Sequence, residues 1–172
     1  MSDLRIERLP ITHPDADRLV EEVQAEYVVR YGGRDDTPLD PSMFDPPRGA
    51  FFVGYLDDVP VATGALRLRD DVLALGSTTT AEIKRMYVAP AGRKTGLARR
   101  MLAHLEGAAL AAGRDVIVLE TGTAQPEAIA LYTSSGYERI DDFGYYKDQP
   151  LSRCFGRRLI PDSPPASATP EL

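Results

Sequence analysis

The sequence predicts a mixed α/β (α+β) fold in which a mostly antiparallel central sheet of six to seven strands is flanked by helices. Three observations predict this class. Strand-like segments joined by short turns come first, a strand–helix–strand crossover follows, and a further helix with two closing strands completes the chain. This order is not that of a doubly wound fold. The 172 residues suit one domain, expected at 1–160, and the proline-rich stretch at 161–172 is expected to be a disordered tail.

The N-terminal segment is expected to contain a strand, a helix and a long loop. Residues 4–9 suit an edge strand, and Pro14 begins a helix whose apolar residues recur at helical spacing. The sequence Tyr31-Gly32-Gly33 ends this helix. Residues 32–50 are punctuated by proline and glycine, and loops of that length inside a compact domain are usually functional or disordered.

The middle of the chain predicts an antiparallel meander. Three strands are expected, at residues 50–56, 61–69 and 80–88. A turn at 57–60 joins the first two, and a weakly patterned segment at 70–79 precedes the third. Pro90 ends the third strand, because proline has no N–H to donate to the ladder.

The C-terminal half supplies the crossover. The clearest helix covers residues 96–112, with its apolar residues on one face. Residues 116–121 form a short apolar strand, which we expect to be buried and parallel to its predecessor. A second helix covers 126–135, and strands from 137 onward and at 152–158 close the sheet.

Composition excludes several classes of function. The chain has 26 acidic and 20 basic residues, a net charge of −6, which disfavours nucleic acid and anionic membranes as partners. One cysteine, Cys154, excludes an intrachain disulfide, and the charged N-terminus does not resemble a secretory signal, so a cytoplasmic location is expected. His13 and His104 lack partners at metal-ligand spacing, so both are expected to be structural and no metal site is predicted.

A short glycine-containing loop joins the strand at 80–88 to the strongest helix. This junction directs unpaired backbone N–H groups and the positive end of the helix dipole at one point, which favours an anion. Gly96 allows close approach of the backbone, and Arg93 and Lys94 add charge for a phosphate. The loop matches neither the P-loop nor the dinucleotide fingerprint. From spacing alone, an ordinary strand-to-helix turn is an equal alternative.

The segment Arg93-Lys94-Thr95-Gly96-Leu97-Ala98 resembles the R/Q-x-x-G-x-G/A signature of the GNAT superfamily of acyl-CoA-dependent N-acetyltransferases. The preceding TAEIKRMYV at 80–88 and LYTSSGY at 131–137 lie where that family has two further motifs. The resemblance covers roughly residues 50–158, and Ala98 stands where glycine is commoner. It implies a central sheet that splays between its fourth and fifth strands.

The resemblance further implies acetyl-CoA as a co-substrate. It places the pyrophosphate on the backbone of Arg93, Lys94, Thr95, Gly96, Leu97 and Ala98. It pairs the pantetheine arm, like an added strand, with the backbone of Met86, Tyr87 and Val88. Gln125 lies where related enzymes often place an amide against the pantetheine or acetyl group, although helix capping beside Pro126 explains this region nearly as well.

Direct acyl transfer to an amine poses two proton problems. The amine must lose a proton to become nucleophilic, and the departing CoA thiolate benefits from a proton donor. Glu82 resembles the catalytic glutamate of histone-type members and is the candidate base, acting through water; pairing with Lys84 or Arg85 is the alternative. Tyr132 resembles a tyrosine near the CoA sulfur and is the candidate acid; a packed core tyrosine is the alternative.

The acceptor site is expected at the end of the first helix, where the resemblance places the cover of the acceptor pocket. Tyr27, Arg30 and Tyr31 are the candidates, and Arg30 suits an acceptor carboxylate; a solvated loop is the alternative.

We therefore expect an N-acetyltransferase acting on the primary amine of a small metabolite or amino-acid-like acceptor. The alternatives are a non-catalytic acyl-CoA sensor, a protein or peptide N-acetyltransferase, and a phosphate-binding protein that does not use CoA. Many relatives form dimers, so the resemblance also implies a homodimer.

Overall fold

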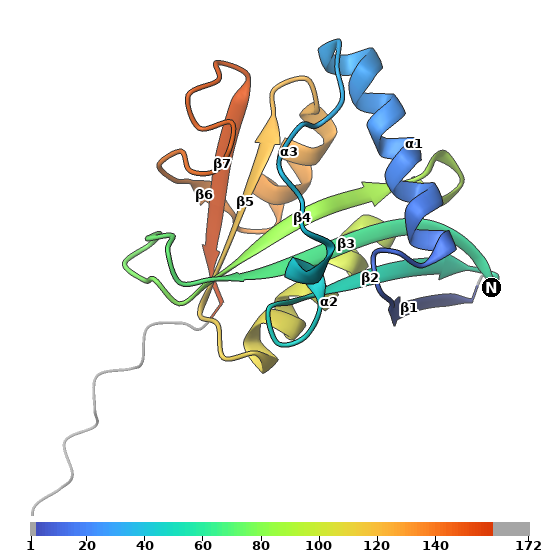
Figure 1. Cartoon of the computed structure of the whole chain (residues 1–172), viewed down its shortest axis with the longest axis horizontal. Coiled ribbons are helices and arrows are strands. Elements are labelled where there is room, and N and C mark those ends of the chain that lie inside the picture. The colour runs from blue at the N-terminus through green and yellow to red at the C-terminus, as the bar shows by residue number, and fades with distance from the viewer. Residues whose placement is uncertain (1–2, 160–172) are drawn as a thin grey trace, which may run out of the picture.

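The computed structural model describes residues 3–159, in which seven strands form one sheet with helices on both faces (Figure 1). The strands are β1 (Leu4–Arg8), β2 (Gly49–Leu56), β3 (Val59–Arg69), β4 (Thr80–Val88), β5 (Val116–Gly122), β6 (Glu138–Arg139) and β7 (Ser152–Arg158). The α-helices are α1 (Pro14–Tyr31), α2 (Leu97–Ala111) and α3 (Pro126–Ser134), and 3₁₀ turns occupy Pro41–Phe44 and Pro90–Gly92. The predicted tail at 161–172 lies outside the described residues.

The sheet confirms the predicted fold class. Its spatial order is β1-β2-β3-β4-β5-β7-β6. The β4–β5 pair is parallel, as the crossover through α2 requires, and the other neighbouring pairs are antiparallel.

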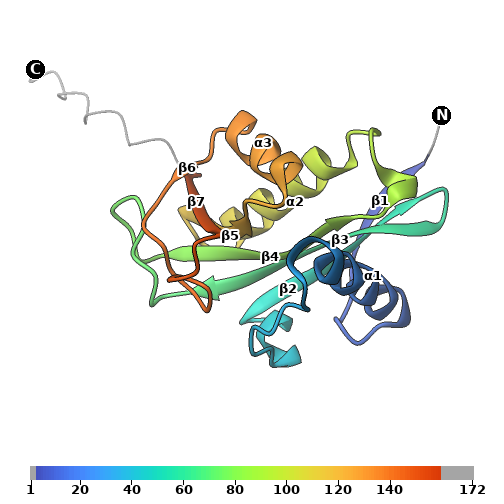
Figure 2. The ribbon, with the colours of Figure 1, turned by 90° about the horizontal axis from the view of Figure 1, so that it is seen from above.

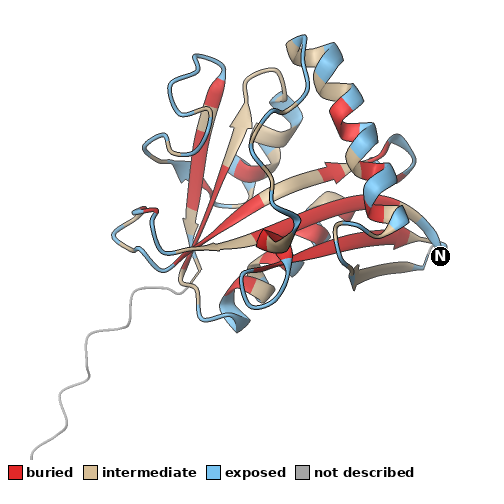
Figure 3. Cartoon of the chain, viewed as in Figure 1, coloured by how far each residue is buried: buried red, intermediate tan, exposed pale blue. Residues whose placement is uncertain are grey.

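Helices cover both faces of the sheet, as Figure 2 shows: α1 packs on one face, and α2 and α3 pack on the other. Strand β2 is consequently buried at seven consecutive positions rather than at alternate ones (Figure 3). The apolar face predicted for α2 is confirmed, since Met101, Leu102 and Leu105 are at most 1% exposed.

Helix ends follow the local signals in the sequence. His13 caps α1 by accepting a hydrogen bond from the Asp15 backbone N–H at 3.1 Å, and α1 ends at Gly32 in the left-handed conformation. Helix α2 starts after Gly96, whose φ of +80° is one that side chains with a Cβ rarely adopt. The expected structural role of His13 is thereby confirmed.

Strands β4 and β5 diverge after a short shared ladder. The ladder pairs residues 80–83 with 116–119 and ends there. Farther along, β4 continues beside β3 and β5 continues beside β7, so the strands separate (Figure 1). The predicted splay is confirmed, and the β4 backbone after Ile83 has no strand partner on its β5 side among residues 3–159.

Two features differ in detail from the expectations. The loop at 32–50 includes a 3₁₀ turn that buries Met43 and Phe44. The first closing strand has only the two residues of β6.

Cys154 is fully buried, as expected. Within residues 3–159 no helix has the length and apolarity to cross a bilayer.

Candidate functional site

A cavity of about 410 Å³ opens where β4 and β5 diverge. Strands β4 and β5, the end of α1 with the loop after it, and the segment between β6 and β7 all contribute to its lining. Glu82, Tyr27, Tyr31 and Gln125, four of the residues singled out in the sequence, line this cavity. The structure therefore brings together residues that lie almost a hundred positions apart in the chain.

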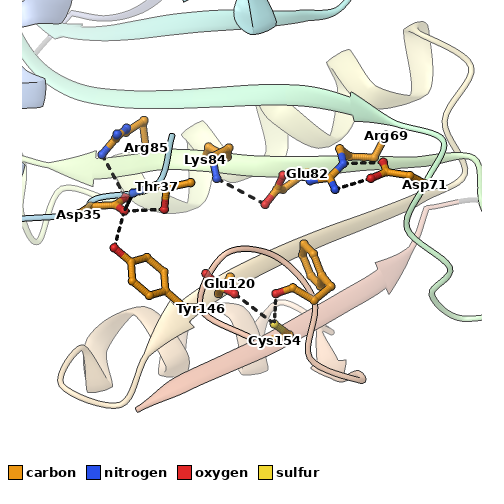
Figure 4. A network of polar contacts seen from close by, with 11 residues as sticks. Asp35, Thr37, Arg69, Asp71, Glu82, Lys84, Arg85, Glu120, Tyr146 and Cys154 are labelled. Carbon is orange, nitrogen blue, oxygen red and sulfur yellow. Dashed lines mark hydrogen bonds and ion pairs between the residues drawn. The ribbon is translucent and has the colours of Figure 1, made fainter. Parts of the chain in front are cut away.

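Glu82 lies in the cavity wall and is held by two cations (Figure 4). Its Oε1 accepts a hydrogen bond from Arg69 Nη1 at 2.9 Å, and its Oε2 lies 3.6 Å from Lys84 Nζ. Arg69 also forms a two-point bond with Asp71, which lowers the pKa of Asp71 to about 2. The ion pair with Lys84 considered in the sequence is thus present, and Arg69 adds to it.

Glu120 is a second cavity carboxylate, which the sequence did not indicate as a candidate. It follows the last residue of β5 that pairs with β4, so it lies where the two strands part. Burial raises its pKa to about 7; Lys84 opposes this rise, and Glu82 and Asp35 add to it. A carboxylate that titrates near neutral pH is suited to exchange protons with a substrate. The sequence signal that could have indicated Glu120 is its position directly after the apolar residues 116–119.

Asp35 connects three elements around the cavity (Figure 4). Its Oδ1 accepts hydrogen bonds from Thr37 N, Thr37 Oγ1 and Tyr146 Oη at 3.0, 2.6 and 3.0 Å. Its Oδ2 lies 3.3 Å from Arg85 Nη1 of β4. Burial raises the pKa of this carboxyl, but the bonds from Thr37 and the charge of Arg85 outweigh burial and lower it overall. Asp35 is therefore an ionised link between the loop after α1, β4 and the β6–β7 segment.

The end of α1 meets the start of α3 across the opening between the strands. Tyr31 Oη donates to Gln125 Oε1 at 3.2 Å. Gln125 stands at the N-cap of α3, but its side chain does not cap the helix. Arg30 does not line the cavity: its Nη1 donates to Ala124 O at 2.8 Å and its Nη2 lies 2.5 Å from Glu127. Arg30 thus joins the two helices and is not turned toward an acceptor.

Tyr27 and Tyr132 approach the same region from opposite faces of the sheet. Tyr27, on α1, lines the cavity, and burial raises its pKa to about 12. Tyr132, on α3, is 5% exposed and packs against Tyr137 with ring centroids 5.7 Å apart. Burial also raises the pKa of Tyr132, with a smaller contribution from Tyr27. Tyr132 does not line the cavity, and its surroundings match the alternative interpretation from the sequence, a packed core tyrosine.

The loop before α2 presents unpaired backbone donors. The first hydrogen bond of α2 runs from Arg100 N to Gly96 O, so the N–H groups of residues 97–99 have no partner within the helix. Arg93 is engaged, donating to Val88 O at 3.0 Å and to Glu26 at 2.7 Å. Lys94 is exposed and forms no side-chain bond with a residue of the described chain. The backbone and Lys94 are therefore the groups available to an anion.

Comparisons with known proteins show which proteins this chain resembles. The model of the acetyltransferase (GNAT) family matches residues 16–137. An IAA acetyltransferase from Azospirillum brasilense is 33% identical over 135 residues, covering 78% of this chain and 84% of that relative.

Solved structures share the fold. A protein from Klebsiella pneumoniae described as an acyl-CoA N-acyltransferase superposes with a TM-score of 0.73 at 26% identity, covering 91% of this chain and 98% of the other. A GNAT family acetyltransferase from Elizabethkingia anophelis with acetyl-CoA bound superposes with a TM-score of 0.62 at 15% identity, covering 90% and 97%.

Proposed function

The chain belongs to the GNAT family of acetyltransferases, and on that premise we propose that it transfers the acetyl group of acetyl-CoA to the primary amine of a small metabolite or amino-acid-like acceptor. The observation that carries the proposal is the cavity at the divergence of β4 and β5, whose lining includes Glu120, the first residue of β5 after its ladder with β4. An unpaired strand edge and a titratable carboxylate thus lie at one opening.

Acetyl-CoA is a substrate in this proposal. The unpaired N–H groups at the start of α2 fit a diphosphate, with the backbone of residues 93–98 as the binding loop and Lys94 adding a positive charge. The backbone of Met86, Tyr87 and Val88 lies on the part of β4 that is free on its β5 side, which suits strand-like pairing with the pantetheine arm. Gln125, in the cavity wall, is proposed to contact the pantetheine or the acetyl group.

Two cavity carboxylates are candidates for accepting the proton of the amine. Both oxygens of Glu82 contact cations, one on Arg69 and one on Lys84. Glu82 is therefore suited to neutralise these cations or to accept a proton through a water molecule. Glu120 forms no ion pair in the described chain, and burial gives it a pKa of about 7. The geometry therefore favours Glu120 as the direct base, whereas Glu82 was predicted from the sequence to act through water.

Tyr132 is proposed to donate the proton that the departing thiolate takes up. This assignment rests on the motif at 131–137, because Tyr132 does not line the cavity; its phenol is protonated at neutral pH, although burial raises its pKa and so weakens it as an acid. The amine nitrogen attacks the thioester carbonyl, the C–S bond breaks, Glu120 receives the amine proton, and the thiolate is protonated.

A contact across the cavity supports a small acceptor over a protein. Tyr146 Oη donates to Asp35 and accepts from the backbone N–H of Asp36 at 2.8 Å, which ties the loop after α1 to the β6–β7 segment. The bridging residues belong to the cavity lining, so they leave less room for a folded protein or a long peptide than for a small amine.

The test is acetyl-CoA-dependent release of free thiol with a panel of primary amines, with the acetylated products identified by mass spectrometry. The proposal expects turnover with small amines, at a rate that Glu120→Gln lowers by about 100-fold or more, the usual contribution of a general base. Glu138→Gln, an exposed carboxylate on β6, is the matched control and is expected to be fully active. Binding of acetyl-CoA without acetylation of any amine would refute the proposal in favour of a sensor.

A further inference from the structure

Arg85 reaches the cavity through an irregularity in β4. Lys84 pairs with Ala65 of β3, and Tyr87 pairs with Thr63. Between these two pairs, β3 has one residue, Gly64, and β4 has two, Arg85 and Met86. This is a β-bulge, and Arg85 has a φ of +53° within it. The Thr63 hydroxyl holds the bulge by donating to Arg85 O at 2.6 Å.

Two consecutive residues at the bulge contribute cations to the cavity. Lys84 and Arg85 both line it, and Arg85 contacts Asp35 of the loop after α1 from this position. The cavity wall formed by β4 therefore carries a guanidinium beside an ammonium.

The guanidinium of Arg85 has more donors than the protein uses. Its side chain is 6% exposed, and its one ion pair, with Asp35, is long at 3.3 Å. Its Nε is buried without a hydrogen-bond partner among the described residues. A guanidinium carries five N–H donors, and leaving a buried donor unpaired is unfavourable. Asp35 already accepts three hydrogen bonds from Thr37 and Tyr146. Its carboxylate therefore has enough donors, whereas the Arg85 guanidinium still has N–H groups without an acceptor in the described part of the chain.

We infer that the acceptor carries a carboxylate as well as its amine, and that Arg85 binds this carboxylate while the amine lies toward Glu120. This inference rests on the proposed function and names its substrate class, an amino acid. The planar guanidinium matches a carboxylate at two points, and Lys84 contributes a second positive charge. Arg85 thus takes the role that the sequence suggested for Arg30, whose guanidinium joins α1 to α3.

The test compares acceptors that differ only in the anionic group. Each amino acid of a panel is assayed beside its carboxamide, its decarboxylated amine and its aminophosphonate analogue. The wild-type protein is expected to favour the amino acid about 10- to 100-fold in kcat/KM, as a charge-assisted pair would give. Arg85→Gln is expected to remove this preference by raising KM for the amino acid, with little change for the decarboxylated amine.

Two further variants separate binding from folding. Arg85→Lys keeps the charge without the two-point geometry and is expected to restore part of the preference. Arg18→Gln, an exposed arginine near the start of α1, is the matched control and is expected to retain the full preference.

The possible outcomes separate the two proposals. Equal use of amines with and without the carboxylate, or equal loss on all acceptors in both Arg85 variants, would refute the carboxylate role and leave the acetyltransferase proposal standing. A preference for the aminophosphonate would assign a phosphate-type group in its place. No acetyl transfer to any amine would overturn both proposals.

Discussion

Replacing Glu120 by glutamine is expected to stabilise the protein at alkaline pH while it removes activity. Burial raises the pKa of Glu120 from 4.5 to about 7, so the folded chain retains a proton that the unfolded chain loses between these values. Stability from this residue is therefore complete below pH 4.5 and is lost as pH rises through 7. At about 1.4 kcal/mol per pH unit the full loss is ~3.5 kcal/mol, and solvent screening of this partly exposed group reduces it to about 1–2 kcal/mol.

Glutamine carries no charge at any of these pH values, so Glu120→Gln avoids this loss. For a domain of this size, the variant's Tm should exceed that of the wild type by about 2–8 °C at pH 8.5, and by less than half as much at pH 5. Thermal unfolding followed by circular dichroism at both pH values measures the difference, with Glu138→Gln as the control. If Glu120→Gln were equally stable or less stable than the wild type at pH 8.5, the assignment of a raised pKa to Glu120 would be wrong.

Three other substitutions test the packing and the chemistry of the site. In Gly122→Ala the new Cβ would lie 1.9 Å from Tyr31 Oη, so Tyr31 must leave Gln125; KM for the acceptor should rise several-fold, and an unchanged KM would show that this contact is dispensable. In Gly64→Ala the Cβ would lie 2.9 Å from Met101 Sδ under α2, so urea denaturation should show a loss of about 1–3 kcal/mol; full stability would mean that the helix shifts freely. Tyr132→Phe should lower kcat far more than it raises KM for acetyl-CoA, and steady-state kinetics with unchanged kcat would end its assignment as the acid.

The elements of the fold could be predicted because each has a local cause in the sequence. Pro14 and Gly32 bound α1, and the apolar run at 116–121 predicted a buried strand parallel to β4. The bulge at Arg85 could not be predicted in this way, because it depends on the register between β3 and β4 and on a bond from Thr63.

The same limit applies to the site. Glu82 was identified from its motif, whereas Glu120 became a candidate only when the divergence of β4 and β5 placed it in a partly buried cavity. Arg30 has the chemistry for a carboxylate, but its ion pair with Glu127 is a contact between segments far apart in the chain. Composition and spacing identify groups that can react, and tertiary contacts decide which of them are available.

The divergence of β4 and β5 also bears on aggregation. An unpaired strand edge at the rim of a sheet invites pairing with other chains, and proteins usually protect such edges with charges, prolines or bulges. Here the unpaired part of β4 lies in the interior of the sheet, and the contacts of Tyr31 and Arg30 with the start of α3 close one side of the opening. A thin, flexible molecule fits such an opening better than a polypeptide strand does. The unpaired backbone groups of β4 are therefore available to a ligand but not to the strands of neighbouring proteins.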